Sequence, residues 1–73
     1  MREYLKELRK NAGLNQTQVA KELGMTQMNY SAIELGKTFK MSVRTIKNLA
    51  NLYNISVERI LNDEWDYELK KFL

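Results

Sequence analysis

Residues 15–35 read NQTQVAKELGMTQMNYSAIEL and carry the most informative pattern in this chain of 73 residues. At the helical period the stretch divides at Gly24 into two short helices, 16–23 and 27–35, each with one apolar side. A glycine just after a helix can adopt the left-handed conformation that ends it, and Thr26 then offers a hydroxyl to cap the next helix. Ala20 is small enough for the second helix to approach closely. The stretch therefore predicts two helices that meet at a steep angle across a very short turn, which is helix-turn-helix geometry.

The residues of this turn recur in a known order. Within the turn they are Gln16, Ala20, Gly24 and then Met25-Thr26-Gln27; around it they are Leu8-Arg9, Gly13-Leu14-Asn15-Gln16, Ile33-Glu34, Gly36-Lys37-Thr38, Ile55-Ser56-Val57 and Ile60-Leu61. Their order and spacing resemble the Cro and repressor class, the XRE family of helix-turn-helix DNA-binding proteins. The resemblance implies an all-α, five-helix fold like the DNA-binding domain of lambda repressor, with the helix-turn-helix at its second and third helices.

Apolar periodicity predicts the remaining helices. The first, 2–12, turns Leu5 and Leu8 inward and places Arg2 among its outward residues. The helix over 42–53 has an apolar stripe that consists of Val43, Ile46, Leu49, Ala50 and Tyr53. The last helix of the domain begins after Ser56 and is expected to bury Val57, Ile60 and Leu61.

The tail forms a second region. We expect residues 1–61 to form the helix-turn-helix domain and residues 62–73 to form an amphipathic tail. One face of a short sixth helix, capped by Asp63, would carry the apolar residues Trp65, Leu69, Phe72 and Leu73. Such a face must be buried. Three coverings stay open: the chain's own domain, a second copy in a homodimer, and a partner protein.

Composition excludes most enzyme classes. The chain has no Cys and no His, so thiolate and histidine metal sites and the commonest general base are absent. No serine has a base beside it and there is no Gly-rich phosphate loop, so we expect no enzyme, no metal, no cofactor and no small-molecule ligand. The carboxylates of the tail are interpreted as a helix-start charge bias: Asp63, Glu64, Asp66 and Glu68.

Charge points to an anionic partner. The formal net charge is +3, but residues 1–61 carry ten Lys and Arg against five Asp and Glu, while residues 62–73 carry two against four. A basic body suits a polyanion such as double-stranded DNA, and an ordinary solvated surface is the alternative. The charged N-terminus and the lack of a long apolar run predict a soluble, cytoplasmic protein without a membrane segment. The resemblance implies a bacterial, phage or mobile-element origin.

The helix 27–35 has an outward face that is polar but uncharged at its start. In the family that the chain resembles, this helix lies in the DNA major groove and reads base edges. The expected base contacts are Gln27, Met28, Asn29, Ser31 and Ala32. Gln27 is the first choice because its amide matches the donor and acceptor of adenine, and Met28 and Ala32 can meet only apolar surface such as a thymine methyl. An A/T-leaning half-site follows, and the alternative for Gln27 is an ordinary exposed residue at the start of a helix.

Phosphate contacts are expected to flank this helix, because they position a reader and supply salt-dependent affinity. Gln16 resembles the family residue at the start of the second helix that binds backbone phosphate. The full expected set is Asn15, Gln16, Lys37, Thr38, Lys40 and Arg44. Phe39 departs from the family, which often has a basic or polar residue at that position.

Two inward positions are interpreted structurally. Arg9 and Glu34 match the family pair that bridges the first helix to the end of the third. Tyr30 stands where the family usually has Ile or Val, and its ring is expected in the core with the hydroxyl at an edge.

These expectations together predict a transcriptional regulator that binds DNA specifically. The preferred form is a small repressor that binds an inverted-repeat operator as a homodimer, with half-sites about one helical turn apart. The alternative is a protein-interaction module, such as an antitoxin or an anti-repressor target, whose tail docks a partner protein.

Overall fold

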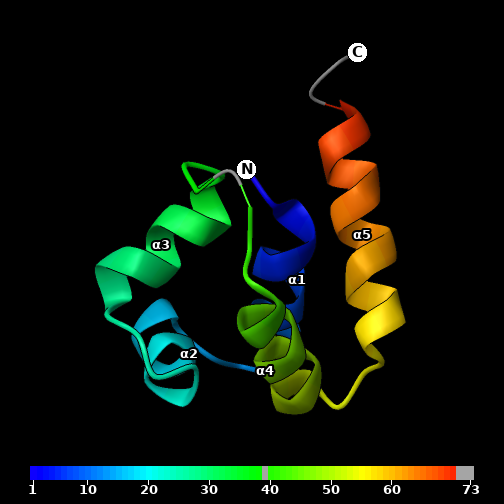
Figure 1. Cartoon of the computed structure of the whole chain (residues 1–73). Coiled ribbons are helices and arrows are strands. Elements are labelled where there is room, and N and C mark those ends of the chain that lie inside the picture. Colours follow the sequence, from blue (N-terminus) through cyan, green and yellow to red (C-terminus); the bar gives the residue numbers. More distant parts are fainter. Residues whose placement is uncertain (39, 71–73) are drawn as a thin grey trace.

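Five helices follow one another in the computed structural model, which describes residues 1–38 and 40–70. They are α1 (Glu3–Asn11), α2 (Gln16–Glu22), α3 (Gln27–Leu35), α4 (Val43–Tyr53) and α5 (Val57–Lys70) (Figure 1). The described residues contain no strand. The predicted all-α, five-helix fold is therefore confirmed, and α2 and α3 are the two helices of the helix-turn-helix.

Side-chain caps begin four of the helices. Asn15 accepts the N–H of Gln18 at 2.8 Å while the Gln18 amide oxygen accepts the N–H of Asn15 at 2.8 Å, a reciprocal capping box at the start of α2. The hydroxyls of Thr26, Ser42 and Ser56 each accept one backbone N–H, that of the residue three positions on, and so cap α3, α4 and α5. The polar residues that the sequence marks as helix starts therefore define where the helices begin.

Residues in the left-handed conformation stand at the ends of α2 and α4. Gly24 follows Leu23, the C-cap of α2, with φ +68°, and a side chain at this φ is strained, so glycine sets the tight turn into α3. Asn54 ends α4 in the same conformation, with φ +54°. Asparagine tolerates this region better than most residues do, but it marks a helix end less plainly than glycine in a sequence.

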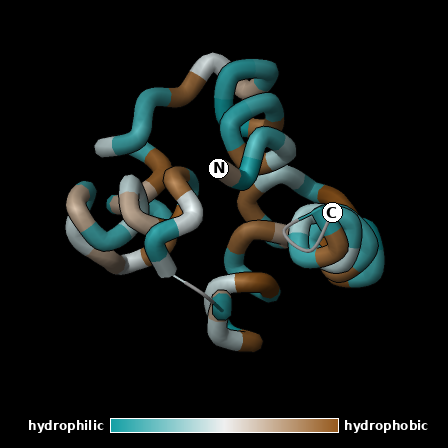
Figure 2. The backbone as a smooth tube through the Cα atoms, turned by 90° about the horizontal axis from the view of Figure 1, so that it is seen from above, coloured by the Kyte–Doolittle hydropathy of each residue, from teal (hydrophilic) through white to brown (hydrophobic). Residues whose placement is uncertain are grey.

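The core lies where α1, α2, α3 and α4 meet and is closed by α5. Its fully or nearly buried apolar residues are Leu5, Val19, Ala20, Leu23, Tyr30, Ile33, Ile46, Leu49, Ala50 and Ile60. In Figure 1, α2 and α3 lie on one side of the molecule and α5 on the other, with α1 and α4 between them. Figure 2 shows α5 nearly end-on at the edge of the molecule, so much of its surface faces outward.

The tail does not start a new helix among the described residues. Instead α5 runs from Val57 to Lys70 without a break, so the expected short sixth helix and its Asp63 cap are wrong. Residues 61–64 contain neither glycine nor proline, and Glu64 is held against the domain by hydrogen bonds from Arg2, so nothing stops the helix there. The boundary drawn at residue 61 falls inside α5. Phe72 and Leu73 lie outside the described residues.

Three apolar residues that were expected in the core face outward. Val43 is 82% exposed at the start of α4, and Val57 and Leu61 are exposed on α5. Each has the right period for its helix, but α5 turns only its Ile60 side fully inward. None of the described helices is both long and apolar enough to span a bilayer.

Candidate nucleic-acid interface

A buried ion pair holds α3 against α1. The Arg9 guanidinium donates to both carboxylate oxygens of Glu34, at 3.0 and 2.8 Å, and to the carbonyl of Leu14 at 3.1 Å. The side chain of Glu34 is 2% exposed and that of Arg9 is 13% exposed. Burial alone would raise the pKa of Glu34, but the hydrogen bonds and charge of Arg9 dominate and lower that pKa below its ordinary value. The expected bridge between the first helix and the end of the third is thus formed.

Tyr30 lies on the inward side of α3. It is fully buried, so the expectation that its hydroxyl reaches an edge is wrong. Burial raises the pKa of this hydroxyl, and the neighbouring Glu34 carboxylate raises it further. Tyr30 therefore stays neutral and helps to fix the inward side of α3, which leaves the opposite side of the helix for contacts.

The outward side of α3 presents most of the expected base-reading residues together. Gln27, Met28 and Asn29 are exposed, Met28 by 80%, while Ser31 and Ala32 are half-buried. A shallow depression of about 330 Å³ on this side is lined by Gln27, Met28, Ser31, Ala32, Leu35 and Lys37. Leu35 was not among the expected residues, although it lies about one turn beyond Ala32 and two turns beyond Met28. Asn29 does not line the depression, and its backbone N–H is used by the Thr26 cap.

A chain of weak polar contacts connects this surface to the buried ion pair. The amide nitrogen of Gln27 donates to the amide oxygen of Gln16 at 3.5 Å, and the amide nitrogen of Gln16 donates to Glu34 at 3.4 Å. Both distances lie at the long limit for hydrogen bonds, so these amides can turn toward another partner at little cost. Gln27, the expected base contact, and Gln16, the expected phosphate contact, are therefore neighbours on this surface.

The other expected phosphate contacts are less uniform. Asn15 is exposed, but its amide oxygen is used in the α2 cap, which leaves its NH₂ as the group that can donate. Lys37 and Arg44 are exposed, and Lys37 lines the same depression as Gln27. Lys40 is exposed but lines a different groove, between α4 and α5, beside Trp65. Thr38 is half-buried, and its carbonyl accepts a hydrogen bond from Arg2. The set therefore divides between two surfaces.

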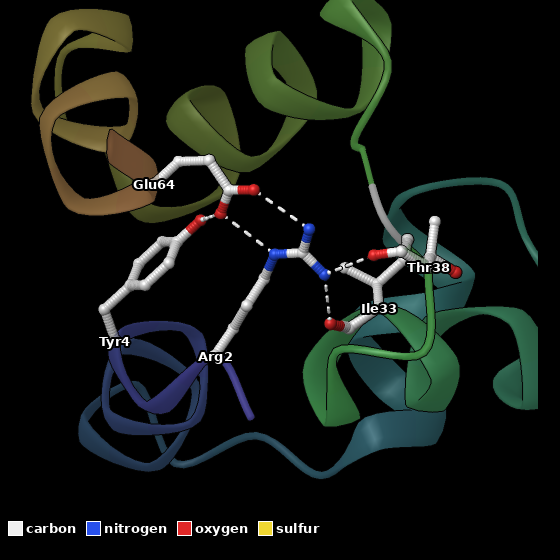
Figure 3. A network of polar contacts seen from close by, with 5 residues as sticks. All are labelled: Arg2, Tyr4, Ile33, Thr38 and Glu64. Carbon is white, nitrogen blue, oxygen red and sulfur yellow. Dashed lines mark hydrogen bonds and ion pairs between the residues drawn. The ribbon is translucent and has the colours of Figure 1, made fainter. Parts of the chain in front are cut away.

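Arg2 is the largest departure from the expectations. It is fully buried, although the sequence pattern places it on the outward side of the first helix. Figure 3 shows its guanidinium between Glu64 of α5 on one side and the carbonyls of Ile33 and Thr38 on the other. Apolar spacing along the sequence cannot predict that Arg2 is buried, because Glu64, the carboxylate that balances its charge, lies 62 residues away.

Two apolar residues of the tail, Trp65 and Leu69, are exposed. Trp65 and Leu69 lie on the outward side of α5, and together with Val57 and Leu61 they form a row whose members are between 41% and 65% exposed. We call these four residues the α5 stripe. Since they recur every four residues, they share one side of the helix.

Comparisons with known proteins agree with this geometry. A family model described as a helix-turn-helix domain matches residues 3–64. The chain is also similar to an uncharacterized HTH-type transcriptional regulator, YqaE, of Bacillus subtilis (strain 168), with 36% identity over 62 residues. That alignment covers 85% of this chain and 53% of the relative, so the chain spans about half the length of the curated relative that it matches. No solved structure matches the chain significantly. The chain belongs to the XRE-type helix-turn-helix family of DNA-binding proteins.

Proposed function

We propose that this protein is a transcriptional repressor that binds an inverted-repeat operator as a homodimer, with one α3 in the major groove of each half-site. The observation that carries the proposal is the outward side of α3, where exposed Gln27 and Met28 lie beside Lys37 over a buried, ion-paired underside. A rigid helix that presents uncharged hydrogen-bonding and apolar groups can distinguish base edges. Cations beside it position the helix on the phosphates.

Gln27 is the proposed reader of an adenine. Bidentate recognition of adenine needs one amide donor for N7 and one amide acceptor for N6. Gln27 can supply both while its second N–H stays on Gln16, because an amide nitrogen has two protons. The contact to Gln16, at 3.5 Å, is weak, so the Gln27 amide can turn to meet the adenine at little cost. The contact of Gln16 to Glu34, at 3.4 Å, is weak enough to be exchanged for a phosphate oxygen.

Met28, Ala32 and Leu35 give the same surface an apolar component. They recur at positions i, i+4 and i+7 of α3, and each lines the depression beside Gln27. Apolar side chains in the major groove favour the thymine methyl group. The proposed half-site is therefore rich in A·T pairs, with an adenine opposite Gln27 and thymines along the apolar row.

The α5 stripe is the proposed contact between two copies. Exposed apolar side chains that form one continuous row mark an association surface, and a two-fold contact needs a single patch that can face itself. The molecule measures 33 × 24 × 22 Å, with α3 and α5 on opposite sides (Figure 1). Two copies joined through α5 therefore carry their α3 helices on the far sides of the dimer from each other.

An apolar groove extends this surface. Its volume is about 370 Å³, and it is lined by Lys40, Met41, Ile46, Glu64, Trp65, Glu68 and Leu69. It receives part of the second copy in the proposed dimer. Lys40 on one wall and Glu68 on the other provide opposite charges that a two-fold contact can pair across the interface.

Selection from a pool of random duplexes at physiological salt tests the proposal. The wild type is expected to enrich an inverted repeat with A/T-rich half-sites. Gln27→Ala is expected to relax the preference at one position of each half-site, while Asn51→Ala, which removes an exposed amide from α4, leaves the preference unchanged. Retention of DNA without any enriched sequence would contradict specific readout.

Sedimentation equilibrium with Trp65→Ala tests the dimer. We expect the wild type to associate and the variant to shift toward a monomer, with weaker binding to the full repeat but the same preference on a half-site. A wild type that stays monomeric alone and on the repeat would contradict the homodimer. It would assign the α5 stripe to a different protein, as in the interaction-module alternative.

A further inference from the structure

The end of α3 is held by a residue from the start of the chain. A helix leaves its last carbonyls without partners inside the helix. In α3 the carbonyl of Ile33 accepts from the Arg2 guanidinium at 2.7 Å, and that of Glu34 accepts from the Arg2 backbone N–H at 2.8 Å. The same guanidinium nitrogen donates to the carbonyl of Thr38 at 3.0 Å. Arg2 thus joins the last turn of α3 to the turn that follows it.

The other side of the Arg2 guanidinium is held by α5. Its Nε and Nη2 atoms donate to the two oxygens of Glu64, each at 2.9 Å, which is the bidentate arrangement that a planar guanidinium favours (Figure 3). Tyr4 donates its hydroxyl to Glu64 at 2.7 Å, and the ring of Tyr67 lies 4.9 Å from the guanidinium carbon. One side chain therefore contacts α5 and the segment that carries Lys37 at the same time.

A second contact brings α5 to the same turn. Gly36 has φ +82°, and a Cβ atom placed on it would overlap the hydroxyl of Tyr67. The α5 helix therefore lies directly against the turn that ends α3. The position of this turn therefore depends on α5 through the Tyr67 side chain as well as through the Arg2 hydrogen bonds.

Stability alone is a weak explanation for this arrangement. Replacing a buried ion pair with apolar residues of similar volume is often neutral or stabilising. An apolar pair could not, however, donate hydrogen bonds to carbonyls in two segments. What Arg2 supplies beyond packing is a fixed spacing between Ile33 and Thr38, and this spacing sets where the residues between them lie.

We propose that Arg2 is a positioning residue through which α5 holds the end of α3 and residues 36–38 in the arrangement that contacts DNA. The proposal rests on the proposed function, because it assigns to Arg2 and Glu64 an effect on the affinity for DNA. Neither residue is proposed to touch the nucleic acid. Both act on where Lys37 and the last turn of α3 lie.

The test uses the double variant Arg2→Met/Glu64→Leu, which replaces the ion pair with apolar side chains and leaves the net charge unchanged. The control is Glu7→Leu/Lys10→Met, which removes an exposed pair of charges from α1 with the same net effect. Three quantities are measured for each: the free energy of unfolding, the affinity for the selected operator, and backbone amide hydrogen exchange. The amides of Lys37 and Thr38 are the reporters, because both donate to the carbonyl of Ala32 in the intact turn.

We expect the double variant to stay folded, to bind the operator roughly 2- to 30-fold more weakly than the control, and to exchange the Lys37 and Thr38 amides faster. Exchange in α2 should match that of the wild type. Unchanged affinity together with unchanged exchange at these two amides would overturn the proposal. If the double variant exchanges these amides faster but the wild type selects no operator, the positioning role would be supported and the proposed function would be refuted.

Glu64→Gln is the second variant if the double variant does not fold. It keeps the shape of the side chain and one acceptor but removes the charge. We therefore expect a smaller loss of affinity for the operator and a smaller increase in exchange at the Lys37 and Thr38 amides. A folded Glu64→Gln protein with wild-type affinity and wild-type exchange at residues 37 and 38 would equally overturn the proposal.

Discussion

Glu34→Ala removes the carboxylate that joins α1 to the end of α3. The wild-type carboxylate accepts two hydrogen bonds from Arg9 and one longer contact from Gln16. Without it, the Arg9 guanidinium loses both hydrogen bonds to Glu34 and keeps the one to the carbonyl of Leu14. The variant therefore leaves a mostly buried charge without its counter-charge.

The size of the effect follows from how deeply the pair is buried. Removing one partner of a buried ion pair destabilises a protein by roughly 3–5 kcal/mol. Arg9 is 13% exposed and can recover some hydration, so the expected loss is at the lower end, about 3 kcal/mol. A domain of 73 residues has a free energy of unfolding of only about 4–11 kcal/mol. The variant should thus lose a large share of its stability, and its Tm should fall by roughly 12–24 °C.

Urea unfolding followed by circular dichroism measures this loss. The control is Glu7→Ala, which removes an exposed carboxylate from α1 and should change the free energy of unfolding by less than about 0.5 kcal/mol. A second variant, Glu34→Gln, keeps the volume and should lie between alanine and the wild type. A Glu34→Ala protein within about 1 kcal/mol of the control would refute the reasoning, because it would mean that the pair contributes no more than a surface pair.

Three further changes have defined outcomes. The pKa of Glu34 is lower in the folded protein than its ordinary value of 4.5. As the pH falls, the unfolded chain therefore takes up a proton before the folded protein does. The stabilisation from the ionised carboxylate is complete above about pH 4.5 and is lost as the pH falls through the lower pKa of the folded protein. Unfolding of Glu34→Gln should therefore depend less on pH between about pH 5 and pH 3, and parallel curves would contradict this. Gly36→Ala should destabilise more than Gly24→Ala, because both have positive φ but only Gly36 lies against the Tyr67 hydroxyl; equal melting temperatures would exclude that contact. Thr26→Ala should lower the free energy of unfolding by about 1 kcal/mol through loss of the α3 cap, and a wild-type value would show that the cap contributes nothing.

Local signals in the sequence predicted the helix-turn-helix and its boundaries well. Asn15 and Thr26 cap the two helices as expected, and Gly24 has the left-handed conformation that the turn requires. These features depend on residues within three or four positions of one another. For the same reason the chosen range of α3, 27–35, agrees with the structure.

Long-range relations were the part that the sequence could not supply. Arg2 is buried because Glu64 reaches it from α5, and α5 continues past residue 61 partly because of that contact. Val43 has the period of a core residue, but it is 82% exposed because none of the described helices covers it. Periodicity tells which residues share a side of a helix, but the arrangement of all five helices decides how much of that side is covered.

The ratio of specific to non-specific affinity is the measurement on which the proposed repressor function depends. Labelled operator from the selection is bound at physiological salt and challenged with unlabelled operator or with a scrambled duplex of equal length. Specific DNA-binding proteins favour their sites by roughly a thousandfold or more, and we expect the wild type to reach that ratio. One bidentate base contact provides about 1–3 kcal/mol of discrimination, so Gln27→Ala should reduce the ratio by at least about fivefold. A wild-type ratio near one, unchanged by Gln27→Ala, would mean that the basic surface binds DNA only as a polyanion and that α3 does not read sequence.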